Sequence, residues 1–379
     1  MSENITNPEA TELTGPWVSS AKRVFGLDFV RAFSILLVLL QHAHVNVPGL
    51  APLKIGAIGV EIFFVLSGFL VGGIALRALT RDCTFTSVFR FWVRRWYRIL
   101  PLYYLMIAVN FYLVSPTIGH NVIWYLLFLQ NNIYGIGFYP VTWSLVIEEW
   151  FYLAMPIVVL IALKVHRSSA AIYVALIGVI LGVNVLRLLY VLNGDVPFNG
   201  VNGNPPFRFD SLFLGVLLAH IKIASPALYR VLETNRVCAL GGTLMLGYLA
   251  IYWMWANPIN RIDELLFPRT IGFFVLASCI ALCLPRFDRW KRVTTSSKVV
   301  KWFSCGVLNT SLLTYAIYLV HPLVYARVFQ SPVYTLGWMS EFLIALLITF
   351  AISWILYRWY EKPFLKLRDR RAPDVSSRI

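Results

Sequence analysis

The chain has 379 residues, of which 59% are hydrophobic and only 13% are charged, and its formal net charge is +15. Soluble globular domains carry roughly a quarter of their residues as Asp, Glu, Lys and Arg, so this composition excludes a string of soluble domains. The cations gather in alternate loops between apolar runs, a pattern that sets membrane topology, and this placement argues against nucleic acid as a partner.

The polar stretch 1–26 lacks the features of a cleaved signal peptide, and we expect it to be a cytoplasmic N-terminal segment. Residues 27–364 are expected to form one integral membrane domain, followed by a basic cytoplasmic tail over 365–379. The five cysteines show no metal-ligand spacing, so the sequence predicts neither a metal site nor a disulfide framework.

Long apolar runs predict an all-α polytopic membrane protein, because ~20 apolar residues cross the bilayer core as a helix. We expect a bundle of about ten transmembrane helices. The expected spans are 27–48, 55–76, 99–118, 145–163, 171–193, 208–221, 238–256, 266–285, 309–330 and 337–360.

The stretch 121–138 is also apolar, but Gln130, Asn131, Asn132 and two glycines interrupt it. Without it, every loop rich in Arg and Lys falls on one side and both termini are cytoplasmic, whereas one more span would break that alternation. We therefore expect 121–138 to be a re-entrant or interfacial segment on the outer side, where the Gly/Asn/Pro-rich loop 193–206 also lies.

Ionisable side chains inside the spans cost roughly 3 kcal/mol each, so they indicate either function or a polar bridge between helices. In the first span, Arg31 and His42 are eleven residues apart, which aligns them on one helix face about 16 Å apart. A histidine there suits proton abstraction from a hydroxyl, although it could equally bond a neighbouring helix. His44 faces away from His42 and is the weaker candidate.

Acidic residues begin two further spans. Glu61 could orient a histidine or bind a hydroxyl, while Gly68 and its neighbours permit close helix packing. Glu148 and Glu149 cannot both face lipid, so one could serve as a base or hold a histidine. Trp143 offers a flat face to a sugar ring, or else belongs to the aromatic belt.

A cluster of arginines, Arg94, Arg95 and Arg98, precedes Pro101, which suggests that they lie at the N-terminus of the third span. Helix N-termini and arginine forks bind phosphate well, so the cluster predicts a cytoplasmic site for a phosphate-bearing donor. Anchoring by positive charge on the inner side is the simpler explanation for some of these charges.

Polar groups in the later spans are less specific. Arg208 and Asp210, at the outer end of the sixth span, could simply pair with each other. His321 lies about mid-membrane in the ninth span. Glu361, at the inner end of the tenth, could mark an interfacial stop or line a donor site.

In this order and spacing, the motifs resemble those of the membrane acyltransferase-3 superfamily, over nearly the whole chain from Leu27 to Leu367. Glu61 stands where aspartate is more usual in that family, a mild departure. The matching segments are Arg31 with His42, GVEIFFVLSGFL at 59–70, RRWYRILP at 94–101, WSLVIEEWFY at 143–152, RFDSLFLG at 208–215, YAIYLVHP at 315–322 and YEKPF at 360–364.

The resemblance implies ten core helices, acetyl-CoA or another acyl-CoA as the cytoplasmic donor, and a carbohydrate hydroxyl as the acceptor. It implies that Arg31 and His42 are required, that Arg95 and Arg98 handle the donor, and that Glu148 is the essential carboxylate of its motif. Some members carry a fused extracytoplasmic esterase-like domain, so a separate extracytoplasmic partner enzyme is an alternative to a protein that acts alone.

The sequence thus predicts a multi-pass O-acyltransferase, expected to be an O-acetyltransferase, of the bacterial cytoplasmic (inner) membrane. His42, which either deprotonates the acceptor or carries the acyl group, is expected to be catalytic together with Glu148 and Arg31. The donor phosphates are expected on Arg31, Arg94, Arg95 and Arg98. Residues expected to bind or support substrate are Glu61, Trp143, Glu149, Arg208, Asp210 and His321.

The acceptor would be a surface glycan, an exopolysaccharide or a glycosylated small molecule. A transporter or flippase of a lipid-linked glycan or small solute is the alternative, because ionisable residues at mid-membrane suit transport equally well.

Overall fold

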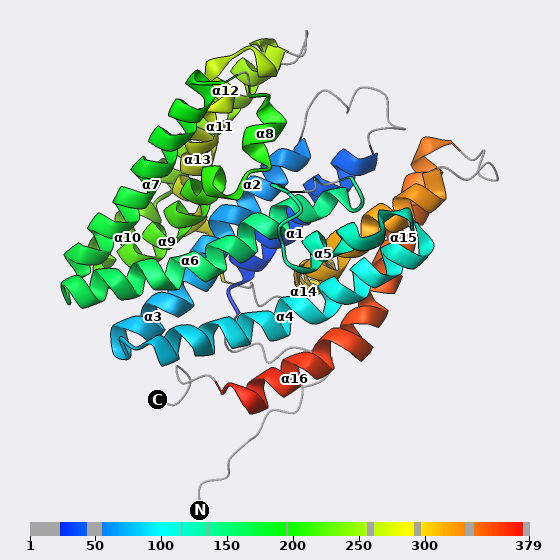
Figure 1. The fold of residues 1–379 in the computed structure, drawn as a ribbon, viewed down its shortest axis with the longest axis horizontal. Helices are drawn as coiled ribbons and strands as arrows, with labels where there is room; N and C mark the ends of the chain where they lie inside the picture. The colour runs from blue at the N-terminus through cyan, green and yellow to red at the C-terminus, as the bar shows by residue number, and fades with distance from the viewer. Residues whose placement is uncertain are drawn as a thin grey trace, which may run out of the picture.

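The computed structural model describes residues 23–43, 55–114, 116–133, 135, 137–194, 196–255, 261–291, 297–329 and 337–373. Every regular element in these ranges is helical, and Figure 1 shows the helices packed as one elongated bundle. His44, most of the expected segment 1–26 and the end of the expected tail lie outside the described residues.

A long helix occupies each apolar run that was expected to span the membrane. These helices are α1 (Phe25–Ala43), α2 (Ile55–Ser67), α4 (Phe85–Leu113), α6 (Trp143–Val165), α7 (Ser169–Leu192), α9 (Phe209–Ala224), α11 (Asn235–Trp255), α13 (Gly272–Asp288), α14 (Lys298–Phe329) and α15 (Trp338–Leu356). The shorter helices are α3 (Gly73–Arg81), α5 (Val122–Leu126), α8 (Phe198–Asn202), α10 (Pro226–Leu232), α12 (Leu266–Arg269) and α16 (Lys362–Arg371).

Within the described residues, 6 helical segments are long and apolar enough to cross a membrane by length and composition. These segments are Phe25–Ala43, Ile55–Arg81, Pro140–Val165, Ser169–Leu192, Lys298–Phe329 and Met339–Arg371. The all-helical, multi-pass membrane class is therefore confirmed, while the count of about ten spans and the side on which the termini lie stay predictions.

The two ends of the bundle differ in the elements that they carry. Figure 1 shows α3, α10 and α16 at one end, which we call the basic end, and α8 and α12 at the opposite end. Within the described ranges, two π-helices interrupt long helices: η5 (Gly68–Gly72) joins α2 to α3, and η10 (Tyr357–Glu361) joins α15 to α16. A β-carbon added to Gly68 would lie 1.9 Å from the carbonyl oxygen of Leu212, so the close packing expected of this glycine is confirmed.

Helix α4 begins well before the expected third span, and this corrects one sequence prediction. Its first residue is Phe85, and the hydroxyl of Thr84 accepts a hydrogen bond from the Ser87 amide at 3.3 Å as an N-cap. Pro101 lies inside the helix rather than in its first turn. The arginines around position 95 are therefore in mid-helix, and a helix N-terminus contributes nothing to their affinity for phosphate.

The stretch 121–138 forms no continuous helix in its described part, because α5 covers only Val122–Leu126. Its buried Gln130 donates amide hydrogens to Tyr103 Oη at 3.3 Å and Thr142 Oγ1 at 3.2 Å. Asn131 donates to the carbonyl oxygens of Trp143 at 2.9 Å and Gly203 at 2.7 Å. These bonds fix the stretch against α4 and the start of α6, and its expected outer location stays a prediction.

Candidate active site

A cavity of about 630 Å³ lies at the basic end of the bundle, and we call it the vestibule. Residues of α1, α3, α4, α14 and α16 line it, and its charged lining is strongly basic. Its arginines are Arg23, Arg31, Arg77, Arg81, Arg90, Arg94, Arg95, Arg98 and Arg368. Only Asp28 and Asp82 oppose them among the lining residues that the structure describes. Such a cavity suits a polyanionic ligand.

A second cavity, of about 130 Å³, continues the vestibule into the bundle, and we call it the inner pocket. Arg31, Arg95 and Arg98 line both cavities, and we call them the neck arginines. The polar groups of the inner pocket otherwise come from Ser67, Ser144, Glu148, Ser311, Thr314, Tyr315 and Tyr318. A dry cavity of ~150 Å³ admits a molecule the size of benzene. The inner pocket is therefore of a size for a small group.

Arg95 is the most firmly held of the neck arginines. Its Nη2 donates to the hydroxyl of Tyr152 at 2.6 Å, and its guanidinium carbon lies 4.1 Å from the centroid of that ring. The same hydroxyl hydrogen-bonds to that of Ser67. The buried Nε of Arg95 has no hydrogen-bond partner among the described residues, so one donor of this guanidinium is unsatisfied.

The other neck arginines have buried carboxylates beside them at distances longer than a hydrogen bond. Arg31 Nη1 lies 3.6 Å from Asp28 Oδ1, and Arg98 Nη1 lies 3.9 Å from Glu361 Oε1. Asp28 is itself held by Arg23, which donates to both of its oxygens, and by Ser311, whose hydroxyl donates to it at 2.7 Å. The carboxylates thus balance charge without occupying the arginine donors through short bonds.

Arg94 also lines the vestibule, but its side chain contacts the C-terminal region. It donates to the carbonyl oxygen of Ala372, and its Nη2 lies 3.4 Å from Asp369 Oδ1. The four arginines expected to hold the donor therefore share one cavity, although they come from two helices.

The paired carboxylates of α6 have different surroundings. Glu148 lines the inner pocket close to Arg95 and Tyr152. Glu149 is only 5% exposed, and its Oε1 has no hydrogen-bond partner among the described residues. Two adjacent positions on a helix point in different directions, so Glu148 alone of the two reaches the inner pocket.

Two histidines meet away from the vestibule. His42 lies in the last turn of α1, and its ring centroid is 4.8 Å from that of His321 on α14. The Nδ1 of His42 is 2.9 Å from the Val38 carbonyl oxygen, and that of His321 is 3.1 Å from the Ile317 carbonyl oxygen. Because a carbonyl only accepts, each Nδ1 carries the hydrogen and each neutral ring has its lone pair on Nε2.

The two histidines differ in access. The side chain of His42 is exposed, whereas His321 is fully buried and its Nε2 has no partner among the described residues. Tyr318 lines the inner pocket, and its ring centroid lies 5.9 Å from that of His321. Ring contacts thus run from Tyr318 in the inner pocket through His321 to His42, which itself does not line the pocket.

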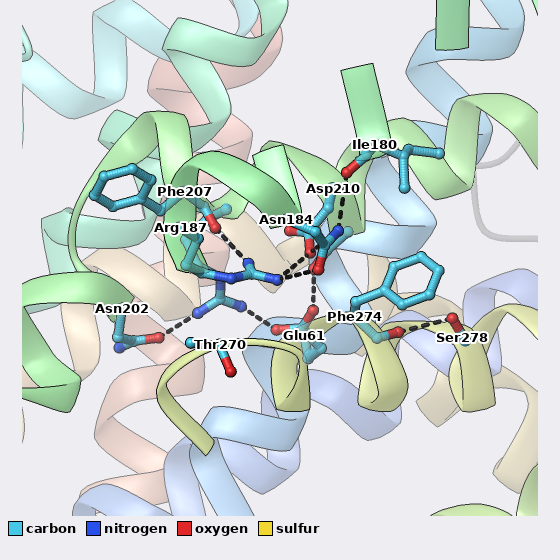
Figure 2. Close-up of polar contacts among 12 residues, drawn as sticks. Glu61, Ile180, Asn184, Arg187, Asn202, Phe207, Asp210, Thr270, Phe274 and Ser278 are labelled. Atoms are coloured by element: carbon cyan, nitrogen blue, oxygen red, sulfur yellow. Dashed lines mark hydrogen bonds and ion pairs between the residues drawn. The ribbon is translucent and has the colours of Figure 1, made fainter. Parts of the chain in front are cut away.

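Four charged residues, Glu61, Arg187, Arg208 and Asp210, form a separate cluster that we call the buried clamp (Figure 2). Arg208 donates to Glu61, and Arg187 Nη2 donates to Asp210 Oδ2 at 2.8 Å. None of the four side chains is more than 3% exposed. Figure 2 shows Asn202 bonded to the same network, so the clamp ties α2, α7 and α9 to the segment before α9.

The clamp excludes the simple alternative that Arg208 and Asp210 pair with each other, while their expected role in binding or supporting substrate stays a prediction. Arg208 lies just before α9 and Asp210 in its first turn, and each finds its partner on another helix. Glu61 accepts hydrogen bonds from Arg208 and from the hydroxyl of Ser211. The Glu61 carboxylate is thus bound to α9 and to the segment just before it.

Trp143, the first residue of α6, packs its ring against Phe64 with centroids 6.3 Å apart. Phe64 lines the inner pocket, so Trp143 supports the pocket wall while its side chain is half-buried. Stacking of Trp143 on a sugar stays a prediction.

Sequence reasoning missed Arg187 and the hydroxyls that surround Arg95. An arginine within the apolar run 171–193 is a signal that could have identified Arg187. Ser67 and Tyr152 carry no such signal, because hydroxyls are common in membrane helices.

Comparison with known proteins gives a consistent set of relatives. The family described as an acyltransferase domain matches residues 24–358. The peptidoglycan O-acetyltransferase of Listeria monocytogenes is 27% identical over 92% of this chain and 56% of its own length. A Bacillus subtilis protein, provisionally named a peptidoglycan O-acetyltransferase, is 28% identical over 93% and 56%. A Staphylococcus aureus protein, provisionally named an O-acetyltransferase, is 26% identical over 90% and 57%.

The chain spans a little over half the length of these curated relatives. No solved structure matches it.

Proposed function

Because the chain belongs to the acyltransferase family that its residues 24–358 match, we propose that it is an integral membrane O-acyltransferase. It takes an acyl group, acetyl by our expectation, from acyl-CoA in the cytoplasm. It transfers the group to a hydroxyl of a carbohydrate that is extracytoplasmic or associated with the membrane. The names of the relatives support an O-acetyl product.

The observation that carries this proposal is the arginine-lined vestibule that continues through the neck into a small inner pocket. Coenzyme A has a phosphorylated nucleotide at one end and a thin, uncharged pantetheine arm at the other. Arginine forks bind phosphate oxygens strongly, and the inner pocket is of a size for the end of the arm with a short acyl group. Loops rich in arginine and lysine favour the cytoplasm, which supports a cytoplasmic basic end.

His42 is proposed to act at the transfer step. Its Nε2 is the basic nitrogen of the neutral ring, since Nδ1 donates to the Val38 carbonyl. About 16 Å along α1 separates Arg31 from His42. Because His42 does not line the inner pocket, the end of the pantetheine arm must pass Tyr318 and His321 to reach it. Two routes share this geometry, direct attack by the acceptor and attack by way of His42.

In the direct route, His42 removes the proton of the acceptor hydroxyl while that oxygen attacks the acyl carbon. The carbon–sulfur bond then breaks, and the proton passes to the departing thiolate. In the covalent route, Nε2 attacks the acyl carbon first and the thiolate leaves, taking up a proton from water. The acceptor hydroxyl then displaces the histidine and releases one proton.

The functional test is the O-acyl content of the cell's glycans, measured by mass spectrometry. We would compare a deletion strain with deletions complemented by wild type, His42→Ala or His166→Ala, the last being an exposed histidine at the end of α6. An ester that is lost on deletion, returns with wild type and His166→Ala, and stays absent with His42→Ala would establish the activity. The relatives make peptidoglycan the first acceptor to examine.

Other results lead to different conclusions. If purified protein consumes acyl-CoA but acylates no glycan, a separate extracytoplasmic partner enzyme completes the transfer. Unchanged glycan esters in all strains, together with no binding of acyl-CoA, would favour the transporter or flippase.

A further inference from the structure

We propose that Glu361 is a positioning residue of the donor site, whose carboxylate holds the Arg98 guanidinium in the neck before acyl-CoA binds. This inference rests on the proposed function, because it assigns a role within the same cavity. Glu361 lies near the C-terminal end of the chain, far in sequence from Arg98.

The surroundings of Glu361 are unusual for a carboxylate. Its side chain is 2% exposed, and neither carboxylate oxygen has a hydrogen-bond partner among the described residues. Its Oε1 lies 3.9 Å from Arg98 Nη1. A buried charge without hydrogen bonds is costly, so the attraction to Arg98 must offset that cost.

The distance between Glu361 and Arg98 determines how the two side chains interact. At 3.9 Å the carboxylate attracts Arg98 without accepting a hydrogen bond from it. Arg98 makes no hydrogen bond to the other described residues, so its N–H donors stay available for phosphate. Asp28 differs from Glu361: its oxygen lies 3.6 Å from Arg31, but it also accepts hydrogen bonds from Arg23 and Ser311.

Charge repulsion explains why such a residue is needed. Arg95 and Arg368 lie close enough to Arg98 to repel it, and Arg31 shares the same neck. The Arg98 side chain is 36% exposed, so without an opposing charge it could swing into the water of the vestibule. With Glu361 present, the guanidinium is already in place when the donor arrives, which lowers the cost of binding.

The π-helix and a neighbouring hydrogen bond hold Glu361 in position. It is the last residue of the π-helix η10, and the adjacent Tyr360 donates a hydrogen bond to the Pro101 carbonyl oxygen of α4 at 3.3 Å. The other π-helix among the described residues, η5, contributes Leu70 and Val71 to both cavities. Single π-turns often occur at functional sites, and here both border the neck.

The test measures binding of CoA to purified full-length protein by calorimetry. Glu361→Gln is expected to raise the Kd for CoA about tenfold, with a similar rise in the KM for acyl-CoA and kcat within about twofold. Glu361→Asp keeps the charge and should recover part of the affinity. Glu341→Gln, a change of the same kind in the first turn of α15, should bind as wild type does.

A double-mutant cycle separates positioning from a general effect on folding. If Glu361 acts through Arg98, then Glu361→Gln costs no further affinity in an Arg98→Gln background. Equal losses in both backgrounds, or Glu361→Gln binding CoA as tightly as wild type or more tightly, would overturn the inference. Wild-type protein that binds no CoA would instead refute the proposed donor.

Discussion

The bundle contains two clusters of arginine and carboxylate that are built in opposite ways. In the buried clamp, no side chain is more than 3% exposed, and the pairs are joined by hydrogen bonds. In the neck, the side chains of Arg31 and Arg98 are 29% and 36% exposed, and their ion pairs measure 3.6 and 3.9 Å. The neck also borders two cavities.

The exposure of the side chains and the hydrogen bonds of their donors distinguish structural charges from binding charges in this bundle. In a sequence, ionisable residues inside the spans look the same whether they pair with another side chain or bind a ligand. Donors that are satisfied inside the bundle hold helices together. Arginines that are held nearby, but whose donors are not consumed, are ready for a ligand.

The largest effect is expected in the clamp, where Arg208→Gln leaves Glu61 buried beside no compensating cation. Removing one partner of a buried pair typically costs about 3–5 kcal/mol. We expect much less protein in the membrane and a lower unfolding temperature, measured by quantitative blotting and by fluorescence of purified protein. Normal abundance with lost transfer would contradict a structural role and place the clamp in the active site.

An intermediate effect is expected in the neck. Arg95→Gln removes a charged fork for phosphate, and a hydrogen bond to a charged group contributes about 1.5–3 kcal/mol. We expect the Kd for CoA to rise about tenfold or more, while the unfolding temperature without CoA changes little. If Arg95→Gln unfolds the protein as readily as a clamp variant does, the two clusters do not differ in the way described.

The smallest effect is expected at the wide part of the vestibule. Arg90 lines the vestibule but not the inner pocket, so Arg90→Gln should weaken CoA binding only about twofold to threefold. Because such contacts are screened by salt, the difference from wild type should shrink at high ionic strength. A loss as large as that of Arg95→Gln would mean that the phosphates sit farther out than the neck.

The sequence predicts where the long helices lie better than it predicts which side chains pair between them. Apolar runs located the long helices because crossing the bilayer imposes a length and a composition. The start of α4 was missed because residues 85–98 are amphipathic and rich in arginine, and Thr84 caps them outside the apolar run. Their place in mid-helix corrects the expected helix N-terminus.

Candidate site residues could be named from the sequence, but their grouping could not. Arg31 and Arg95 share a cavity, as expected of donor-binding residues, although they lie on different helices. The partner of Arg208 is 147 residues away in the chain, and no local pattern specifies such a pairing. The contact between His42 and His321 is equally remote in sequence and depends on how α1 packs against α14.

The most direct test of this account measures CoA binding and acyl transfer on the same purified preparations of wild type, Arg95→Gln and His42→Ala. We expect that Arg95→Gln loses affinity for CoA, and that His42→Ala binds CoA as wild type does but transfers no acyl group. The proposed mechanism would be contradicted if His42→Ala transferred acyl groups at the wild-type rate, or if Arg95→Gln bound CoA normally.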